Sequence, residues 1–549
     1  MNITVINLKV QNGLFAVSGL SLIGDGGGVD AAFVIINSLF QRTDDRLLST
    51  TNVRWGPSGS AVPSVLSLGS SPGQRVTTAV LFTNLYLVGA PTSLTVSGCD
   101  FQCSGTTSTI VGSLTYACAG MLLANSKSTV DSTISDAARM SIAGGNTFTT
   151  SHPKYEPVGM LLLTFMLRLV SGGELQLSGN TMTSTGPVST STSVAIAGSS
   201  WTLSKNSTAS IMSNAMTSTS VSDSGDGVKM YDGSIISASE NSAFRIESNT
   251  MVMSGTTGAN VGTTGIYTEA FSILLNTQSV FSVRFNNIQC KRLSTAGGAY
   301  PIFFFGTVAG KPFQIFDSSV FAVDDNVLTG SRGTTGTGCA LASTMSVARG
   351  GVVSVSRNTI NVFSDGFGQG ASGIILYSSV ITVSEYGALI VKGNTIGING
   401  GSGAHALGIT HQQSANVALY EGSTYTISAN TISLRSASGS TGSMPFQLFI
   451  STISLSNKSL ATSKFAAPST MLFTANTISL VSSSPALQFV KLDTGGSTTS
   501  DSNYNRFIIS DNRGTGGSSS AWGGNAPSGK HPYVLMRCNA VGGVTLSST

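Results

Sequence analysis

The heptapeptides "SANTISL" at 428–434 and "TANTISL" at 474–480 agree at six of their seven positions. A third stretch, "GNTIGI" at 393–398, repeats their centre, and its asparagine lies 36 residues before the asparagine of the first. In each stretch apolar residues alternate with polar ones on either side of a single asparagine. Alternation with a period of two is typical of a strand with one buried face, so the asparagine marks a bend between two strands of a repeating unit.

The same pattern recurs along most of the chain. Apolar residues stand five and three positions before the asparagine, and another stands two positions after it. Cys99 occupies the asparagine position in "LTVSGCDF" at 94–101, while Asn512 has the first half of the pattern but Gly514 at its last position. Spacings from Asn180 to Asn512 run from 32 to 46 residues and average about 37, which predicts a repeat architecture. The complete matches are Asn180, Asn214, Asn249, Asn286, Asn326, Asn358, Asn394, Asn430 and Asn476.

These observations predict an all-β fold, a right-handed single-stranded parallel β-helix with one coil per repeat. Each coil would hold three short strands, two turns and one Ser/Gly/Thr-rich loop. Coils stack roughly 4.8 Å apart, so the asparagines would form a ladder whose side chains hydrogen-bond from coil to coil. We expect asparagine itself to adopt the left-handed backbone of the bend, because it tolerates that conformation better than other non-glycine residues.

The pattern also sets boundaries and a core. We expect irregular first coils in 1–90, the β-helix with its ladder in 91–515, and a C-terminal strand, cap or truncated continuation in 516–549. The alternation predicts inward-facing side chains at Phe244, Ile246, Val353, Val355, Leu389, Val391, Ile396, Tyr425, Ile427 and Ile432.

Composition excludes several classes of function. The 549 residues include 28 basic and 24 acidic ones, a net charge of +4 without a basic run, so nucleic acid is not an expected partner. The stretch "GNAPSGKH" at 524–531 lacks the hydroxyl residue of a phosphate-binding loop. We therefore predict no cofactor.

No segment of the chain is typical of membrane insertion or of a signal peptide. The longest apolar stretch, at 159–170, is too short to span a bilayer and carries Arg168. The first residues, "MNITVINLKVQNG", lack the features of a signal peptide. We expect either a cytosolic protein or one piece of a longer exported protein, which would reach a membrane only through segments outside this chain.

Cysteine and histidine give little evidence of chemistry. Among the six cysteines, Cys99, Cys103 and Cys118 cluster in the sequence. Three arrangements stay open: a Cys99–Cys103 disulfide, a Cys103–Cys118 disulfide, or free buried thiols. The histidines have no cysteine or acid nearby that would complete a metal shell, so we predict no metal site and place them in loops or on the surface. They are His152, His405, His411 and His531.

A search for catalytic carboxylates finds only two adjacent pairs, Asp44–Asp45 and Asp324–Asp325. Neighbours on a strand point to opposite faces, whereas a glycosidase needs two carboxylates that converge on one bond. We therefore predict no catalytic residues, and assign these pairs to a strand end and a turn.

Two further features concern the surface. The outward position two residues before the ladder asparagine holds Glu247, Arg284 and Asp324 in successive repeats, which predicts a column of alternating charge. Its simplest interpretation is a structural ion-pair column, and a sugar-binding strip is the alternative. Candidate N-glycosylation sites are Asn2, Asn206 and Asn457.

The coil pattern inside Ser/Gly/Thr-rich repeats resembles the β-helix repeats of pectin-lyase-like proteins. The whole chain, including "GLSLIGDGGGVDAAFVIINSLFQRTDD" at 19–45, is similar to the dispersed gene family surface proteins of trypanosomes. That resemblance implies a large surface glycoprotein with membrane segments near its C-terminus and a role in adhesion to host cells or matrix. Because this chain is far shorter than such proteins, we expect it to be a fragment or a truncated copy of one.

The sequence favours a non-catalytic extracellular or surface protein, in which a β-solenoid displays loops to host-cell proteins, matrix or glycans. Many weak contacts along a repeating frame add up to useful avidity. Two alternatives stay open. One is a polysaccharide lyase or glycoside hydrolase with the pectin-lyase-like fold, and the other is a truncated copy without independent function.

Overall fold

The computed structural model describes residues 2–24, 31–43, 54–55, 60–61, 78–105, 116–125, 131–256, 262–292, 297–306, 312–331, 333, 335–364, 370–377, 380–401, 406–436, 443–455, 467–480, 490–500, 506–511, 513–516, 534–541 and 545–547. Within these residues every regular element is a β-strand. The strands pair in parallel, apart from the antiparallel pair β7 (Arg54–Trp55) and β8 (Ser60–Ala61). The prediction of an all-β parallel solenoid is confirmed.

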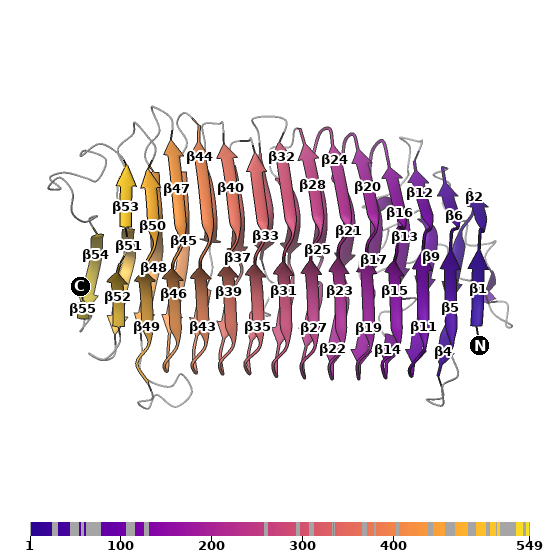
Figure 1. Ribbon diagram of the computed structural model, residues 1–549, viewed down its shortest axis with the longest axis horizontal. Helices are drawn as coiled ribbons and strands as arrows, with labels where there is room; N and C mark the ends of the chain where they lie inside the picture. The colour runs from indigo at the N-terminus through magenta and orange to yellow at the C-terminus, as the bar shows by residue number, and fades with distance from the viewer. Residues whose placement is uncertain are drawn as a thin grey trace. The chain divides into compact units, whose positions relative to one another are not determined.

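The chain divides into two compact units, whose strands are drawn as arrows in Figure 1. The first consists of Met1–Gly258 with Glu269–Phe271, and the second of Ala259–Thr268 with Ser272–Thr549. Each unit contains three parallel sheets, which we call sheets A, B and C. Successive coils contribute neighbouring strands to each sheet, so that one coil lies beside the next.

In the first unit, sheet A consists of β1 (Asn2–Ile6), β5 (Ala32–Ile36), β11 (Ser93–Ser97), β15 (Arg139–Ala143), β19 (Glu174–Ser178), β23 (Thr208–Met212) and β27 (Ala243–Glu247). Sheet B consists of β2 (Lys9–Gln11), β6 (Leu39–Arg42), β12 (Asp100–Ser104), β16 (Thr147–Ser151), β20 (Thr181–Gly186), β24 (Ala215–Ser220) and β28 (Thr250–Gly255). Sheet C takes two strands from each coil: β3 (Phe15–Ser18), β4 (Ser21–Ile23), β9 (Thr78–Thr83), β10 (Tyr86–Val88), β13 (Tyr116–Ala124), β14 (Ser132–Ser135), β17 (Glu156–Leu163), β18 (Leu167–Val170), β21 (Ser191–Ala197), β22 (Ser200–Ser204), β25 (Gly225–Tyr231) and β26 (Ile235–Ala238).

In the second unit, sheet A consists of β31 (Val280–Arg284), β35 (Val320–Asp324), β39 (Val352–Ser356), β43 (Ala388–Lys392), β46 (Thr424–Ser428), β49 (Thr470–Thr474), β52 (Arg506–Ser510) and β55 (Thr545–Ser547). Sheet B consists of β32 (Asn287–Arg292), β36 (Val327–Ser331), β40 (Thr359–Ser364), β44 (Thr395–Gly400), β47 (Thr431–Ser436), β50 (Thr477–Leu480) and β53 (Arg513–Gly516). Sheet C holds β29 (Thr263–Glu269, all but its last residue in this unit), β30 (Ser272–Leu275), β33 (Gly298–Phe305), β34 (Phe313–Ile315), β37 (Thr335–Ala342), β38 (Met345–Val347), β41 (Gly370–Tyr377), β42 (Val380–Val383), β45 (Ala406–Leu419), β48 (Ser443–Leu455), β51 (Val490–Ser500) and β54 (Val534–Val541).

A typical coil therefore has four strands, where the sequence predicted three. The stretch 184–193 shows the reason: its composition of Ser, Thr, Gly and Pro predicts a loop, whereas β20 extends through Gly186 and β21 begins at Ser191. Ser184 and Thr192 are buried there and hydrogen-bonded to each other, because the Ser184 hydroxyl donates to the Thr192 carbonyl at 2.8 Å. Inward hydroxyl residues replace the apolar alternation, and the sequence pattern misses such strands. At the start of the chain, β1 pairs with β5 in full register.

The bend between sheets A and B differs from its prediction in one respect. The left-handed residue is the one before the ladder asparagine, for example Ser213 (φ 55°) and Ala429 (φ 54°), and the described ladder asparagines do not have positive φ. The expectation that asparagine itself supplies the left-handed backbone is wrong. Its side chain has a different task, described below.

The corner between sheets C and A has its own repeated geometry. Two consecutive left-handed residues, such as Lys205 and Asn206, precede a buried serine, here Ser207. The backbone N–H of Ser207 donates to the Ser242 hydroxyl of the next coil at 3.2 Å. Ser207 and Ser242 thus link two successive coils at this corner, a contact that the sequence concealed because serine is abundant everywhere.

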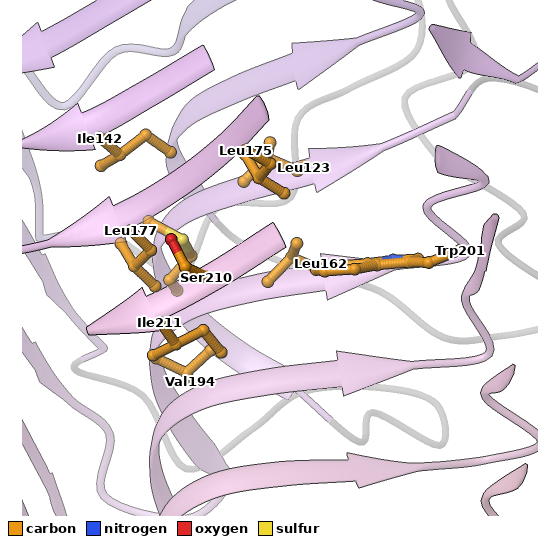
Figure 2. A pocket seen from close by; sticks show the side chains of 10 residues that line it. Leu123, Ile142, Leu162, Leu175, Leu177, Val194, Trp201, Ser210 and Ile211 are labelled. Carbon is orange, nitrogen blue, oxygen red and sulfur yellow. The ribbon is translucent and has the colours of Figure 1, made fainter. Parts of the chain in front are cut away.

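The core lies between the three sheets of each unit. All ten side chains predicted to point inward are buried, none of them more than 1% exposed. Figure 2 shows part of the first unit's core, where Leu162, Val194 and Trp201 of sheet C face Leu175 and Ile211 of sheet A around a void of about 20 Å³. So small a void is consistent with close packing.

Candidate functional site

The ladder asparagines of the first unit form a continuous hydrogen-bonded column. Asn180 donates from both its backbone N–H and its Nδ2 to Oδ1 of Asn214, each at 3.0 Å, and Asn214 does the same to Asn249. The Nδ2 of Asn214 also donates to the Leu177 carbonyl of the preceding coil at 3.0 Å. Each amide thus satisfies buried groups in the coils on both sides of it.

This column includes one asparagine that the sequence pattern missed. Nδ2 of Asn146 donates to Oδ1 of Asn180 at 2.8 Å, and Oδ1 of Asn146 accepts from the Cys99 backbone N–H at 3.0 Å. An extra glycine, Gly144 or Gly145, lengthens the approach to Asn146 by one residue and breaks the pattern. A search that allowed one inserted glycine would have found it. Cys99 occupies the equivalent position in the preceding coil, as its sequence predicts.

The second unit has the same arrangement. The backbone N–H and Nδ2 of Asn394 donate to Oδ1 of Asn430 at 3.0 and 2.9 Å, and Asn430 donates likewise to Asn476. Asn512 lies outside the described residues. The remaining members of this column, linked in the same way, are Asn286, Asn326 and Asn358.

The expected charge column is present in part. Arg284 and Asp324 are paired in register, and Nη2 of Arg284 lies 3.4 Å from Oδ2 of Asp324. Glu247 belongs to the first unit and Arg284 to the second, so the contact between these two stays a prediction. Asp324 is buried, and its other oxygen accepts from the Ser354 hydroxyl and the Ser356 backbone N–H at 2.8 and 2.9 Å.

Asp324 and Asp325 depart from the expectation that they point to opposite faces. Asp325 has a left-handed backbone, φ 58°, which ends the alternation of the strand. Arg357 then reaches both carboxylates, at 3.6 Å from Oδ2 of Asp324 and 2.7 Å from Oδ2 of Asp325. Hydrogen bonding to Asp325 raises the pKa of the Arg357 guanidinium. The cluster of Arg284, Asp324, Asp325 and Arg357 therefore balances two positive and two negative charges. Asp44 and Asp45 lie outside the described residues.

The sequence did not predict a second polar cluster, which lies on sheet C of the first unit. Lys229 Nζ lies 3.4 Å from Oε1 of Glu156 and 3.8 Å from Oδ2 of Asp226, and 4.7 Å from the centre of the Tyr231 ring. The Thr192 hydroxyl donates to the same Glu156 oxygen at 2.6 Å. Burial alone would lower the pKa of Lys229, but the two carboxylates outweigh it and the pKa is raised. Only the coil register brings Glu156 to Lys229, since the two lie 73 residues apart in the sequence.

The described histidines are buried, which corrects their expected placement in loops or on the surface. His152 is 1% exposed, and its Nδ1 accepts from the backbone N–H groups of Lys154 and Tyr155. His411 points into the core of the second unit, where Nε2 lies 2.5 Å from the Tyr425 hydroxyl and Nδ1 has no partner. Burial lowers the pKa of His411 to about 3. The sequence could not show this, because position 411 is recognisable as a core position only when His411 is placed beside its register partner in the neighbouring coil, Leu376. His405 and His531 lie outside the described residues.

The structure selects one of the three cysteine arrangements. Cys103 and Cys118 form a disulfide with their Cα atoms 5.6 Å apart, and Cys99 is a free buried thiol. Cys339 is likewise buried and free, and Cys290 is also buried. Burial raises the pKa of Cys339 to about 12, so it stays protonated at neutral pH.

Two of the three candidate glycosylation sites can be placed. Asn206 is exposed in the left-handed turn before β23, and Asn2 is exposed at the start of β1, where its Oδ1 accepts from the Ala32 backbone N–H at 3.1 Å. Asn457 lies outside the described residues, as does the stretch at 524–531. Asn206 is the better acceptor, because the side chain of Asn2 already takes part in strand pairing.

The described part of the chain lacks two features, a metal-binding group and a membrane-spanning helix. No group of three or more His, Cys, Asp or Glu side chains there could hold a metal ion. Those residues also include no helix of the length and apolar character needed to cross a membrane. No protein-family model, curated protein or solved structure matches this chain.

Proposed function

We propose that this protein is a non-catalytic extracellular or surface scaffold, which displays loops on a β-solenoid for contact with host-cell proteins, matrix or glycans. The main observation behind the proposal is that the repeats differ in length in the segments that connect their sheets. The strands of sheets A and B keep their register from coil to coil, as in β39, β43 and β46. The segments between sheets B and C change from 187–190 to 437–442 and 481–489. The segments between sheets C and A also vary, from 205–207 to 456–469, and a constant frame with connections of variable length is typical of a surface that evolves new contacts.

The compartment is supported by chemistry and by resemblance. A Cys103–Cys118 disulfide persists in oxidising surroundings such as the cell exterior. The similarity to the dispersed gene family surface proteins of trypanosomes supports the same location. The exposed Asn206 offers a place for N-linked glycan in that compartment.

The enzymatic alternative would need an acid and a base free to act on a polysaccharide. Glu156 and Asp226, which sheet C brings together, are buried and both contact the Lys229 ammonium. Asp324 is held by Arg284, Ser354 and Ser356. A carboxylate held by ion pairs and hydrogen bonds contributes to the stability of the fold and is poorly placed to accept or donate a proton in catalysis. This arrangement favours a scaffold over an enzyme.

Two assays on the purified chain test the proposal. The first measures its binding to host cells and to immobilised matrix proteins, and the second measures release of reducing ends or unsaturated products from acidic and neutral polysaccharides, with and without calcium. We expect saturable binding and no turnover. Sustained turnover that Glu156→Gln or Asp226→Asn abolishes would replace the scaffold by the enzyme. The absence of both binding and turnover would favour a copy without independent function.

A further inference from the structure

A hollow of about 310 Å³ lies on the outer surface of sheet B in the second unit. Four consecutive strands, β36, β40, β44 and β47, contribute to it. Its outward-facing lining includes Thr329, Asn361, Phe363, Gly397, Asn399 and Ser433.

The hollow exists because one row of side chains has a gap. Thr329, Asn361, Gly397 and Ser433 are register partners across the four strands. A Cβ added at Gly397 would meet the flexible end of Asn361, with Oδ1 at 2.9 Å, and would lie at an ordinary 3.9 Å from the Ile360 carbonyl. In the first unit the same row is filled by threonines at 149, 183 and 217. Glycine at 397 therefore opens a space that the fold does not require.

The chemistry around the gap is specific. Phe363 keeps 37% of its surface exposed at one side of the hollow, so part of the ring is available for a ligand to cover. The amides of Asn361 and Asn399 and the hydroxyls of Thr329 and Ser433 offer both donors and acceptors. The lining includes no charged side chain. Arg435, the register partner of Asn399, is exposed and is not among the lining residues.

We propose that this hollow binds a neutral sugar unit of a glycan chain. An aromatic ring flanked by uncharged amides and hydroxyls suits a pyranose, which presents apolar C–H groups on one face and hydroxyls at its edge. The volume lies at the lower end of the range for small-ligand sites, which fits a sugar unit better than a protein segment. This inference rests on the proposed contact function and names its ligand class and location.

The test measures affinity by calorimetry for neutral gluco-, galacto- and manno-oligosaccharides and for uronic-acid oligomers. Phe363→Ala removes the ring, and Gly397→Thr fills the gap with the residue that this row already tolerates in the first unit. Phe285→Ala is the matched control, because this ring is 60% exposed, is not among the lining residues, and occupies a turn position where Ala429 stands in another coil. We expect Phe363→Ala and Gly397→Thr to weaken binding by about tenfold or more, while Phe285→Ala binds as the unaltered chain does. Thermal unfolding of each variant shows that the fold is kept.

The outcomes separate the site from the broader function. Equal neutral-sugar binding by all variants would overturn this site and leave glycan contact elsewhere on the chain. No binding of any neutral oligosaccharide would overturn the inference, while the cell and matrix assay would still decide the scaffold function. A preference for uronic-acid oligomers that Arg435→Ala removes would overturn the neutral class.

Discussion

The two units build the same coil around different cores. Two positions after the ladder residue, the first unit has Phe101 and Phe148, whose stacked rings lie 4.6 Å apart, whereas the second has Ile360 and Ile396. Four positions after it, the contrast is sharper still. Three consecutive coils of the first unit bury hydroxyl side chains in this row, Thr150, Ser184 and Ser218, whereas three consecutive coils of the second bury branched aliphatic ones, Val362, Ile398 and Leu434.

The hydroxyl row of the first unit is hydrogen-bonded throughout the part described. Thr150 and Ser184 share a hydrogen bond of 2.8 Å, and Ser218 pairs with Ser193 at 2.9 Å. In the second unit Val362, Ile398 and Leu434 fill these positions without polar partners. The ladder and the turns are the same in both units, so they set the coil, and the filling may be polar or apolar provided that every buried group is satisfied.

The largest expected effect on the free energy of unfolding comes from comparing the aliphatic core of the second unit with the hydroxyl-containing core of the first. Ile398→Ala should lower the free energy of unfolding by about 2–5 kcal/mol, because it removes a fully buried aliphatic side chain. Ser184→Ala should cost about 1–2 kcal/mol, from hydrogen bonds lost at Thr150 and at the Thr192 carbonyl. Denaturant unfolding of both variants measures the difference. Equal losses would show that the two cores are not held by different interactions.

A glycine on sheet C tests how closely the aliphatic core is packed. A Cβ at Gly338 would lie 2.1 Å from Cγ2 of Ile360 and 2.9 Å from the Gly373 carbonyl. We expect Gly338→Ala to cost about 3 kcal/mol through overpacking. Gly397→Ala is the control on the outer surface, and it should change the free energy of unfolding by less than about 0.5 kcal/mol. A tolerated Gly338→Ala would mean that the core of the second unit is loose at this point.

Acid should weaken the second unit through His411. Its pKa is about 3 in the folded chain and about 6.5 in an unfolded one. The unfolded chain therefore binds the extra proton as the pH falls below about 6.5, and stability declines from there down to about pH 3. At pH 5 the loss relative to pH 8 should be about 2 kcal/mol.

Unfolding at pH 8 and pH 5 checks this, with His411→Leu combined with Tyr425→Phe as the control that removes both the imidazole and the hydroxyl bonded to it. The double variant should lose that part of the pH dependence. An unchanged pH profile would show that His411 does not titrate as described.

The smallest effects are expected at surface ion pairs. Arg139 lies 3.3 Å from Glu174 in the first unit, with both side chains at least a third exposed. Arg284→Ala and Arg139→Ala should each cost less than about 1 kcal/mol, and less still in high salt. The Arg284 variant should be the costlier of the two, because it leaves part of the buried Asp324 charge uncompensated. Thermal unfolding at low and high salt compares them, and a larger loss for Arg139→Ala would contradict the ranking.

The sequence predicted the features that repeat in apolar residues and asparagine. The period, the ladder and the ten core positions all followed from one alternating pattern, because burial and turn geometry constrain those side chains in every coil. The sequence did not reveal repeated contacts that are made by residues common throughout the chain. The serines between sheets C and A and the buried hydroxyl residues in the row of Ser184 cannot be recognised in a chain that is rich in serine and threonine. The Lys229 cluster forms only when the coils are stacked in register.

The most direct test of the central claim replaces one ladder asparagine in each unit. Asn214→Ala and Asn430→Ala each remove an amide that accepts two hydrogen bonds from one neighbouring coil and donates to carbonyls on both sides. Because both cores depend on the same ladder, the two variants should lose similar free energies of unfolding, about 2–3 kcal/mol. Thr431→Ala, at the exposed position beside Asn430, should change it by less than about 0.5 kcal/mol. Losses at both asparagines no larger than that of the control would contradict the ladder as the element that holds successive coils together.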